Sequence, residues 1–405
     1  MAKKTPLKKA LLLENIHADA VTLLKKNDFE VVTHPKAMSE QELTKALQGV
    51  SYLGIRSKTQ VTAEVIASAS HLEVIGAFCI GTNQIDDAAC TKRGIAVFNA
   101  PYSNTRSVVE LVVAEMIMLL RKATDKSRDA HNREWDKSSA GCYEIRGKKL
   151  GIIGYGNIGS QLSVIAEALG MEVGFYDIAE KLALGNAKKM KSQKALLEWA
   201  DIVTLHVDGR KENKNLIDAA ALRQMKQGSY LLNLSRGHVV DIEALAQALK
   251  RGHVAGAAVD VFPYEPKGND EAFMTPLQGI PNVILTPHIG GSTEEAQYDI
   301  GQYVGTRFID YRDNGNTPLS VNFPEIQIPR VAGATRIVHV HKNVPGMLAQ
   351  INDTLAERNI NVVGQLLKTN ERIGYAVTDF EGKTAKDLLE SLQSIEGTIA
   401  ARLLS

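Results

Sequence analysis

The chain has 405 residues, which is too long for one hydrophobic core, because cores stop growing beyond about 250 to 300 residues. We therefore expect two or three domains. The 47 lysine and arginine residues nearly balance the 46 aspartate and glutamate residues, so no overall charge favours nucleic acid or an anionic membrane as a partner. The three cysteines, Cys79, Cys90 and Cys142, are scattered, which argues against a disulfide framework or a metal site and favours a reducing compartment.

The N-terminal segment contains a basic stretch followed by a short apolar run that ends at Glu14. This run is shorter than the core of a secretory signal peptide. Elsewhere, no apolar stretch approaches the roughly 20 residues that cross a bilayer. We therefore expect a soluble, cytoplasmic protein without a membrane or nucleic-acid partner.

Short apolar runs alternate with helical patterns over the first hundred residues. The runs at 9–13, 50–55 and 72–77 are predicted strands. This alternation is typical of βα units around a parallel sheet. A longer apolar stretch at 107–121 predicts one largely buried helix that leads into a second domain.

The alternation restarts after Gly147. Strands are predicted at 149–153, 172–176, 202–206, 230–233, 256–261 and 283–286. Strands separated by helical crossovers predict a Rossmann-type, doubly wound parallel sheet. A helix at 294–312 follows, and the glycine- and proline-containing loop after it predicts an interdomain linker.

Residues 335–405 form a separate pattern of strands and helices. Strands are predicted at 336–341, 361–367, 374–380 and 398–403, and helices at 345–357 and 384–395. This βαββαβ order predicts a ferredoxin-like unit. The chain as a whole is therefore predicted to be an α/β protein.

A glycine motif, Gly154-Tyr-Gly156-Asn-Ile-Gly159, directly follows a predicted strand and opens a predicted helix. Gly154 would allow a tight turn, Gly156 a close approach to a pyrophosphate, and Gly159 close helix packing. Asp177 ends the next strand, where it would bind ribose hydroxyls and repel a 2′-phosphate, which favours NAD over NADP. The alternative is an ordinary glycine turn, but the strand, helix and acid in the right order favour the cofactor.

Polar residues follow the last three predicted strands: Arg236, Glu265 and His288. Ligands of such folds bind at the carboxyl ends of the strands. An arginine can hold a carboxylate, a histidine can transfer a hydroxyl proton near neutral pH, and a carboxylate can orient that histidine. Each residue alone could be an ordinary loop residue. Together they predict hydride transfer between a nicotinamide and C2 of a small 2-hydroxy acid.

The order of these motifs, continued by Thr286-Pro287-His288-Ile289-Gly290-Gly291, closely resembles the D-2-hydroxyacid dehydrogenase family over residues 9–320. The resemblance implies a flavodoxin-like, discontinuous substrate-binding domain at 1–104 and 292–322, an NAD-binding domain at 105–291 and a linker at 323–334. The predicted cofactor-binding residues are Gly154, Gly156, Asn157, Ile158, Gly159, Asp177, Leu234, Ser235, Arg236, Asp260, His288, Ile289, Gly290 and Gly291.

Two loops of the N-terminal part are predicted to bind the substrate. Arg56 and Lys58 follow one predicted strand and would suit a phosphate or carboxylate remote from C2. Gly81 follows another strand and would let backbone amides reach the substrate carboxylate. A solvated basic loop is the alternative. The family resemblance adds Asn104 and Lys137 as substrate contacts.

The C-terminal unit resembles the ACT domain, an amino-acid-sensing module, in the sequence from His339 to Gly346 and in Asn361. Asn343 and Asn361 offer amides that can donate to a carboxylate and accept from an ammonium group, although Asn343 could instead cap a helix. An ACT domain joined to this dehydrogenase family implies oxidation of 3-phosphoglycerate to 3-phosphohydroxypyruvate, the first step of L-serine synthesis. It also implies reduction of 2-oxoglutarate as a second activity, a homotetramer, and L-serine as an effector bound by His341, Asn343 and Asn361.

Other functions fit parts of the sequence. A glycerate or lactate dehydrogenase of the same family would keep the same three catalytic residues, but Arg56 and Lys58 favour a phosphorylated acid. A non-catalytic, NAD-sensing corepressor would keep them too, and the ACT-like unit argues against it. An amino-acid-binding regulator with an inactive enzyme part is disfavoured by the intact triad.

Overall fold

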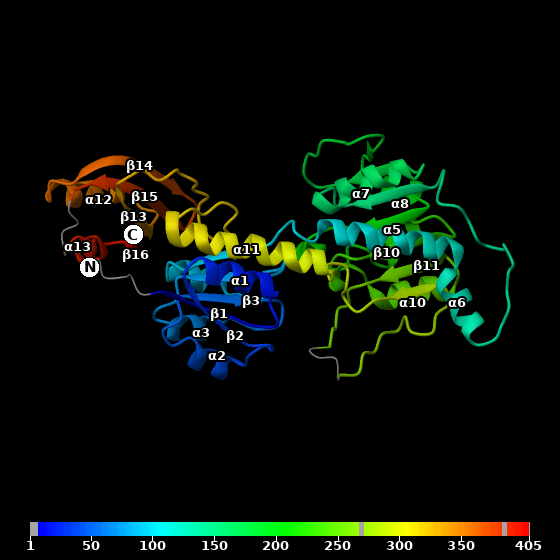
Figure 1. Cartoon of the computed structure of the whole chain (residues 1–405). Helices are drawn as coiled ribbons and strands as arrows, with labels where there is room; N and C mark the ends of the chain where they lie inside the picture. The colour runs from blue at the N-terminus through cyan, green and yellow to red at the C-terminus, as the bar shows by residue number, and fades with distance from the viewer. Residues whose placement is uncertain (1–6, 267–270, 383–386, 405) are drawn as a thin grey trace. The chain divides into compact units, whose positions relative to one another are not determined.

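The computed structural model describes residues 7–266, 271–382 and 387–404. The chain divides into two compact units, Met1–Ser103 with Gln297–Ser405, and Asn104–Ala296, and Figure 1 shows the secondary structure of each. The first unit contains a parallel and an antiparallel sheet, and the second contains one parallel sheet. In the part of the chain that is described, no helix has the length and apolar character needed to cross a membrane.

The parallel sheet of the first unit has the strand order of flavodoxin-like folds. Its strands are β1 (Lys8–Leu12), β2 (Phe29–Thr33), β3 (Tyr52–Ile55), β4 (Val74–Ala77) and β5 (Ala96–Asn99), in the order β2-β1-β3-β4-β5. The connecting helices are α1 (Ala18–Lys26), α2 (Glu40–Ala46), α3 (Ala63–Ser68) and α4 (Asp87–Lys92). The strands β3 and β4 are buried along their whole length, as expected for a sheet covered on both faces.

The sheet of the second unit has the predicted doubly wound topology. Its parallel strands are β6 (Lys149–Ile153), β7 (Glu172–Tyr176), β8 (Lys188–Lys189), β9 (Ile202–Leu205), β10 (Ser229–Asn233), β11 (Val254–Val259) and β12 (Val283–Leu285), in the order β12-β11-β10-β9-β6-β7-β8. The helices are α5 (Thr105–Arg121), α6 (Ala123–His131), α7 (Asn157–Ala168), α8 (Gln193–Trp199), α9 (Ala219–Gln224) and α10 (Ile242–Lys250). The strand order reverses at β6, where ligands of this fold bind.

The long helix α5 is buried along one face. Val108, Val112, Met116 and Leu119 recur at helical spacing and belong to one core cluster with Leu232 of β10. Figure 1 shows α5 alongside β10 and β11. The helix ends where Lys122 adopts a left-handed conformation with φ 50°.

Residues 315–334 follow helix α11 (Glu294–Asn314) and form no helix or strand. Phe323 and Ile326 nevertheless lie in the core of the first unit. The buried amide of Asn322 accepts a hydrogen bond from Val97 N at 2.9 Å and donates one to the Ile95 carbonyl at 2.9 Å. Asn322, the last residue of the predicted substrate-binding segment, is therefore bound beside β5, and the first part of the predicted linker packs into the core of the same unit.

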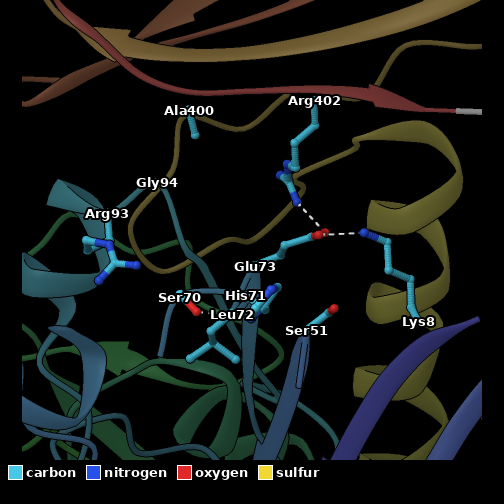
Figure 2. A pocket seen from close by; sticks show the side chains of 10 residues that line it. All are labelled: Lys8, Ser51, Ser70, His71, Leu72, Glu73, Arg93, Gly94, Ala400 and Arg402. Atoms are coloured by element: carbon cyan, nitrogen blue, oxygen red, sulfur yellow. Dashed lines mark hydrogen bonds and ion pairs between the residues drawn. The ribbon is translucent and has the colours of Figure 1, made fainter. Parts of the chain in front are cut away.

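The C-terminal elements confirm the predicted βαββαβ order. They are β13 (Thr335–Lys342), α12 (Met347–Ala356), β14 (Asn361–Thr369), β15 (Ile373–Glu381), α13 (Leu388–Ser394) and β16 (Thr398–Leu404), in an antiparallel sheet of order β14-β15-β13-β16. The last helix is predicted to begin at residue 384, and residues 383–386 lie outside the described part of the chain. Figure 2 shows that Arg402 of β16 points toward Glu73, which also pairs with Lys8.

Candidate active site

The glycine motif forms the turn between β6 and α7. Gly154 has φ +90°, and an added Cβ would lie 2.4 Å from the His206 carbonyl oxygen. A Cβ at Gly159 would lie 2.3 Å from the Gly154 oxygen, whereas one at Gly156 would meet nothing within 4 Å. Gly154 and Gly159 are therefore required by the fold, and Gly156 leaves open space before the first N–H groups of α7, which begins with Asn157.

Asp177 lies directly after β7 and contacts the same turn. Its Oδ2 accepts a hydrogen bond from Tyr155 N at 2.7 Å and its Oδ1 accepts one from Ala179 N at 2.8 Å. A carboxylate has about four lone-pair positions, so it can hold the turn and still accept from ribose hydroxyls. The open space at Gly156 and this fixed carboxylate fit a dinucleotide such as NAD.

The loop after β10 holds Arg236. The side chain of the fully buried Asn233 accepts hydrogen bonds from Ser235 N at 3.1 Å and Ser235 Oγ at 2.8 Å, and donates one to the Arg236 carbonyl at 3.1 Å. A Cβ at Gly237 would come within 2.0 Å of the Phe262 carbonyl, so only glycine fits there. These contacts fix the half-buried Arg236 beyond the end of the strand.

Asp260 organises the loop after β12. Its carboxylate is 1% exposed and accepts hydrogen bonds from Thr286 Oγ1 at 2.6 Å, Ile289 N at 2.8 Å and Gly290 N at 2.9 Å. Within this loop, His288 has φ 55°, and its N–H donates to the Asp260 carbonyl at 2.8 Å. Both carboxylate oxygens of Asp260 are therefore already engaged in positioning the histidine, so any contact with a cofactor would be additional.

His288 and Glu265 form a hydrogen-bonded pair. His288 Nδ1 lies 2.8 Å from Glu265 Oε2, and Glu265 Oε1 accepts a hydrogen bond from Phe262 N at 3.0 Å. The hydrogen bond to Glu265 raises the pKa of His288, against the opposing effect of burial. Burial alone would raise the pKa of Glu265, but the bonds from His288 and Phe262 lower it below its usual value. The pair leaves Nε2 of His288 available to exchange a proton with a substrate.

Sequence reasoning missed two titratable residues in this region. His206 follows β9, its Nδ1 is buried without a partner among the described residues, and burial lowers its pKa to about 3. The position just after a strand was the signal that could have found it. Glu115 is 1% exposed on α5, and burial, together with the charge of Asp260, raises its pKa to about 8. The sequence signal that could have identified Glu115 is an acidic residue on the apolar face of a predicted helix.

The structure places the other predicted substrate residues differently. Asn104 is the N-cap residue of α5, its Oδ1 is buried without a partner among the described residues, and a Cβ at Gly291 would lie 2.1 Å from its Nδ2. Asn104 thus lies against the loop that follows His288. Lys137 lies in the exposed segment 132–140, which forms no helix or strand, and the structure does not bring it to this loop.

Arg56, Lys58 and Gly81 lie in loops that follow β3 and β4 of the first unit. Arg56 is half-buried and Lys58 is exposed. Among the described residues, neither the guanidinium nor the ammonium group has a hydrogen-bond or ion-pair partner. Both cations are therefore available for an anionic ligand.

The predicted effector residues do not meet within one chain. His341 and Asn343 lie at the end of β13, where Asn343 Nδ2 donates to the Asn370 carbonyl at 2.8 Å and His341 Nε2 is buried without a partner among the described residues. Asn361 begins β14 and pairs with Glu381, whereas His341 pairs with Gly374 at the other end of β15. The two groups therefore lie at opposite ends of the sheet.

The fold and this site define an NAD-binding dehydrogenase, and comparison with protein families agrees. The NAD binding domain of the D-isomer specific 2-hydroxyacid dehydrogenases matches residues 113–290, and an ACT domain like that of the AHAS small subunit matches residues 337–400. A D-lactate dehydrogenase from Aquifex aeolicus, solved in complex with NAD and lactic acid, is 25% identical with a TM-score of 0.68, covering 78% of this chain and 100% of that chain.

Two curated relatives match along nearly the whole chain. The D-3-phosphoglycerate dehydrogenase of Haemophilus influenzae is 51% identical over 98% of this chain and 97% of the relative. The enzyme of that name from Escherichia coli K12 is 48% identical over the same shares. The chain therefore belongs to the D-isomer specific 2-hydroxyacid dehydrogenase family. It is an NAD-dependent oxidoreductase with an ACT domain, and its predicted resemblance to the D-3-phosphoglycerate dehydrogenases is confirmed.

Proposed function

We propose that this protein oxidises 3-phospho-D-glycerate to 3-phosphohydroxypyruvate, the first step of L-serine synthesis. The observation that carries the proposal is the His288–Glu265 pair at 2.8 Å, a proton-transfer group oriented by a carboxylate beyond the end of a strand. The choice of substrate is supported by the names of two relatives that match 98% of the chain. The free cations Arg56 and Lys58 support a phosphorylated acid over lactate or glycerate.

The proposed roles divide the substrate among several groups. His288 Nε2 takes the proton of the C2 hydroxyl, while Glu265 stabilises the imidazolium that forms. Arg236 holds the carboxylate and polarises the developing ketone. Bound NAD supplies the acceptor for the C2 hydride. Arg56 and Lys58 bind the phosphate, and Gly81, Asn104 and Lys137 are proposed as further substrate contacts.

NAD would be held mainly by backbone groups. Gly154, Gly156 and Gly159 with the N–H groups of Asn157 and Ile158 would receive the pyrophosphate, and Asp177 the adenosine ribose. We assign the remaining cofactor contacts to Leu234, Ser235, Arg236, Asp260, His288, Ile289, Gly290 and Gly291, all in loops that follow strands of the same sheet.

L-Serine is the proposed feedback effector. Its ammonium and carboxylate groups would be bound by the Asn343 and Asn361 amides and by His341. Because Asn361 lies at the other end of the sheet from His341, one chain cannot supply all three. Two copies paired antiparallel along β14 would bring Asn361 of one chain toward His341 of the other. This supports an oligomer, for which we propose a homotetramer.

The test is NADH formation by the purified protein. We expect activity with 3-phosphoglycerate that far exceeds activity with D-lactate or D-glycerate, and a decrease on addition of L-serine but not of D-serine. Preference for lactate or glycerate would overturn the substrate assignment, and NAD binding without turnover of any 2-hydroxy acid would favour a sensor. We also propose that the protein reduces 2-oxoglutarate, and oxidation of NADH on addition of 2-oxoglutarate tests this second activity.

A further inference from the structure

Glu14 binds the backbone of the loop that carries Arg56 and Lys58. The Glu14 side chain is 8% exposed. Its Oε1 accepts hydrogen bonds from Arg56 N at 3.3 Å and Thr59 N at 2.9 Å, and its Oε2 accepts one from Lys58 N at 3.0 Å. Three backbone N–H groups of a loop distant in sequence thus donate to one carboxylate.

This carboxylate continues the pairing of β1 with β3. Leu13 N donates to the Gly54 carbonyl at 2.9 Å, as in the sheet. Directly beyond, Glu14 and Asn15 adopt left-handed conformations with φ 61° and 54°, and the backbone turns away from β3. The Glu14 side chain then takes the place of a strand partner. Two successive non-glycine residues in this region are unfavourable and persist only where surrounding contacts enforce them.

Gln84 fixes the same loop from its other side. Gln84 is buried, with 4% of its surface exposed. Its Nε2 donates to the Arg56 carbonyl at 2.7 Å and to the Gly81 carbonyl at 3.2 Å. The predicted substrate loop 56–59 is therefore bound to Gln84 of loop 79–84 on one hand and to Glu14, which follows β1, on the other.

We infer that Glu14 is a positioning residue for substrate binding, which presents the Arg56 and Lys58 side chains to the phosphate of the substrate. The inference rests on the proposed function, because it needs a phosphorylated substrate. Glu14 uses its two oxygens on backbone donors, so the two cations keep their charge free for the ligand. Without the carboxylate, the N–H groups of Arg56, Lys58 and the buried Thr59 would lose their acceptor, and the loop would rearrange to satisfy them.

The main variant is Glu14→Gln, which keeps the shape but replaces one acceptor oxygen with an NH2 group facing an N–H donor. We expect the KM for 3-phosphoglycerate to rise about tenfold, with kcat and the Kd for NADH within about twofold of the wild type. A loop that only binds the remote phosphate contributes equally to ground and transition states, so its loss changes KM and leaves kcat.

A double-variant cycle links the effect to the cations. The variant with Arg56→Ala and Lys58→Ala is expected to raise the KM for 3-phosphoglycerate, and adding Glu14→Gln should then raise it no further. An unchanged KM in the cation variant would overturn the proposed phosphate-binding function. A raised KM there, with an unchanged KM in Glu14→Gln or a full further increase on combination, would overturn only the positioning role.

Two further variants guard against a general loss of structure. Glu73→Gln alters another half-buried carboxylate of the same unit, whose partners are the side chains of Lys8 and Arg402 (Figure 2), and its KM should stay near the wild-type value without serine. If Glu14→Gln does not fold, Gln84→Met carries the test, because it releases the Arg56 carbonyl. An unchanged KM in Gln84→Met would then overturn the positioning role.

Discussion

His288 is held in a left-handed conformation, with φ 55°, that few histidines adopt. Its N–H bonds to the carbonyls of Asp260 and Thr286 and its ring bonds to Glu265, so both backbone and side chain are fixed before substrate arrives. Strain of this kind is retained where the surroundings over-determine it, and it concentrates at functional sites.

Replacing the proposed base tests its role directly. His288→Ala should lower kcat by about 10² to 10⁴-fold, because it removes the group that accepts the hydroxyl proton. The Kd for NADH, measured by fluorescence titration, should change little. His131→Ala, at the exposed end of α6, is the control, and near-wild-type turnover of His288→Ala would contradict the assignment.

The pH dependence tests the partner of His288. Because Glu265 raises the pKa of His288, Glu265→Gln should lower that pKa. Ketone reduction needs the protonated ring and falls as pH rises through its pKa, so this fall should occur at lower pH in the variant. The pH profile of kcat/KM for reduction measures the shift. An unshifted profile with a lower plateau would mean that Glu265 only orients the ring.

Local motifs made part of this site predictable from the sequence. The characteristic spacing of Gly154, Gly156 and Gly159 is visible within six consecutive residues. Arg236 and His288 follow apolar runs that can be recognised as strands. The contacts that hold the site have no local signal in the sequence. Glu14 bonds to a loop more than forty positions away, and the Asp260 carboxylate bonds to residues 26 to 30 positions later, contacts that only the fold creates.

At the scale of the element, α5 carries an acid on its buried face. Glu115 is 1% exposed, with both carboxyl oxygens unpartnered among the described residues. Its pKa of about 8 in the folded protein exceeds the ordinary value of the unfolded chain. Between these two values the folded state binds the extra proton, so stability falls as pH rises from the unfolded toward the folded pKa, by at most about 1.4 kcal/mol per pH unit.

Glu115→Gln removes this titration. Relative to the wild type, the variant should gain stability steadily between pH 5 and pH 8, as measured by urea unfolding at a series of pH values. Glu110→Gln is the matched control on the same helix, because Glu110 is exposed and pairs with Arg106. A stability difference that is constant with pH would show that Glu115 ionises normally.

Edge strands explain where the element prediction fell short. The central strands β3 and β4 are fully buried and read as continuous apolar runs. The edge strand β2 has a mixed pattern, with only Phe29 buried, because an edge position places fewer demands on side chains. The other edge strand, β5, is buried over three of its four residues.

At the scale of the whole molecule, the arginine of a buried ion pair within the ACT sheet also joins that sheet to the chain that precedes it. Arg336 is fully buried and donates to both Asp379 oxygens at 2.6 Å, and also to the carbonyls of Asn314, Ile328 and Pro329. Burial alone would raise the pKa of Asp379, but the bonds from Arg336 and Val331 N lower it. The Nε, Nη1 and Nη2 atoms of Arg336 therefore all donate hydrogen bonds within one unit.

Breaking this pair should be costly. Arg336→Met leaves a buried carboxylate without its cation, which we expect to lower stability by about 3 to 5 kcal/mol. The double variant Arg336→Met with Asp379→Leu should recover much of the loss, because no charge stays buried. Thermal and urea unfolding measure both. A double variant no more stable than Arg336→Met would mean that the carbonyl contacts, not the charge pair, dominate.

The discontinuous first unit has a consequence for synthesis on the ribosome. Its core unites Tyr52 and Phe98 of the first sheet with Phe308 of α11 and with Tyr375 and Leu404 of the last strands. The middle unit is one continuous stretch, Asn104–Ala296, and can fold as it emerges, whereas the N-terminal strands gain these core partners only after α11, β15 and β16 have been synthesised. A nascent chain arrested before β16 would thus present an uncovered apolar face to chaperones and proteases.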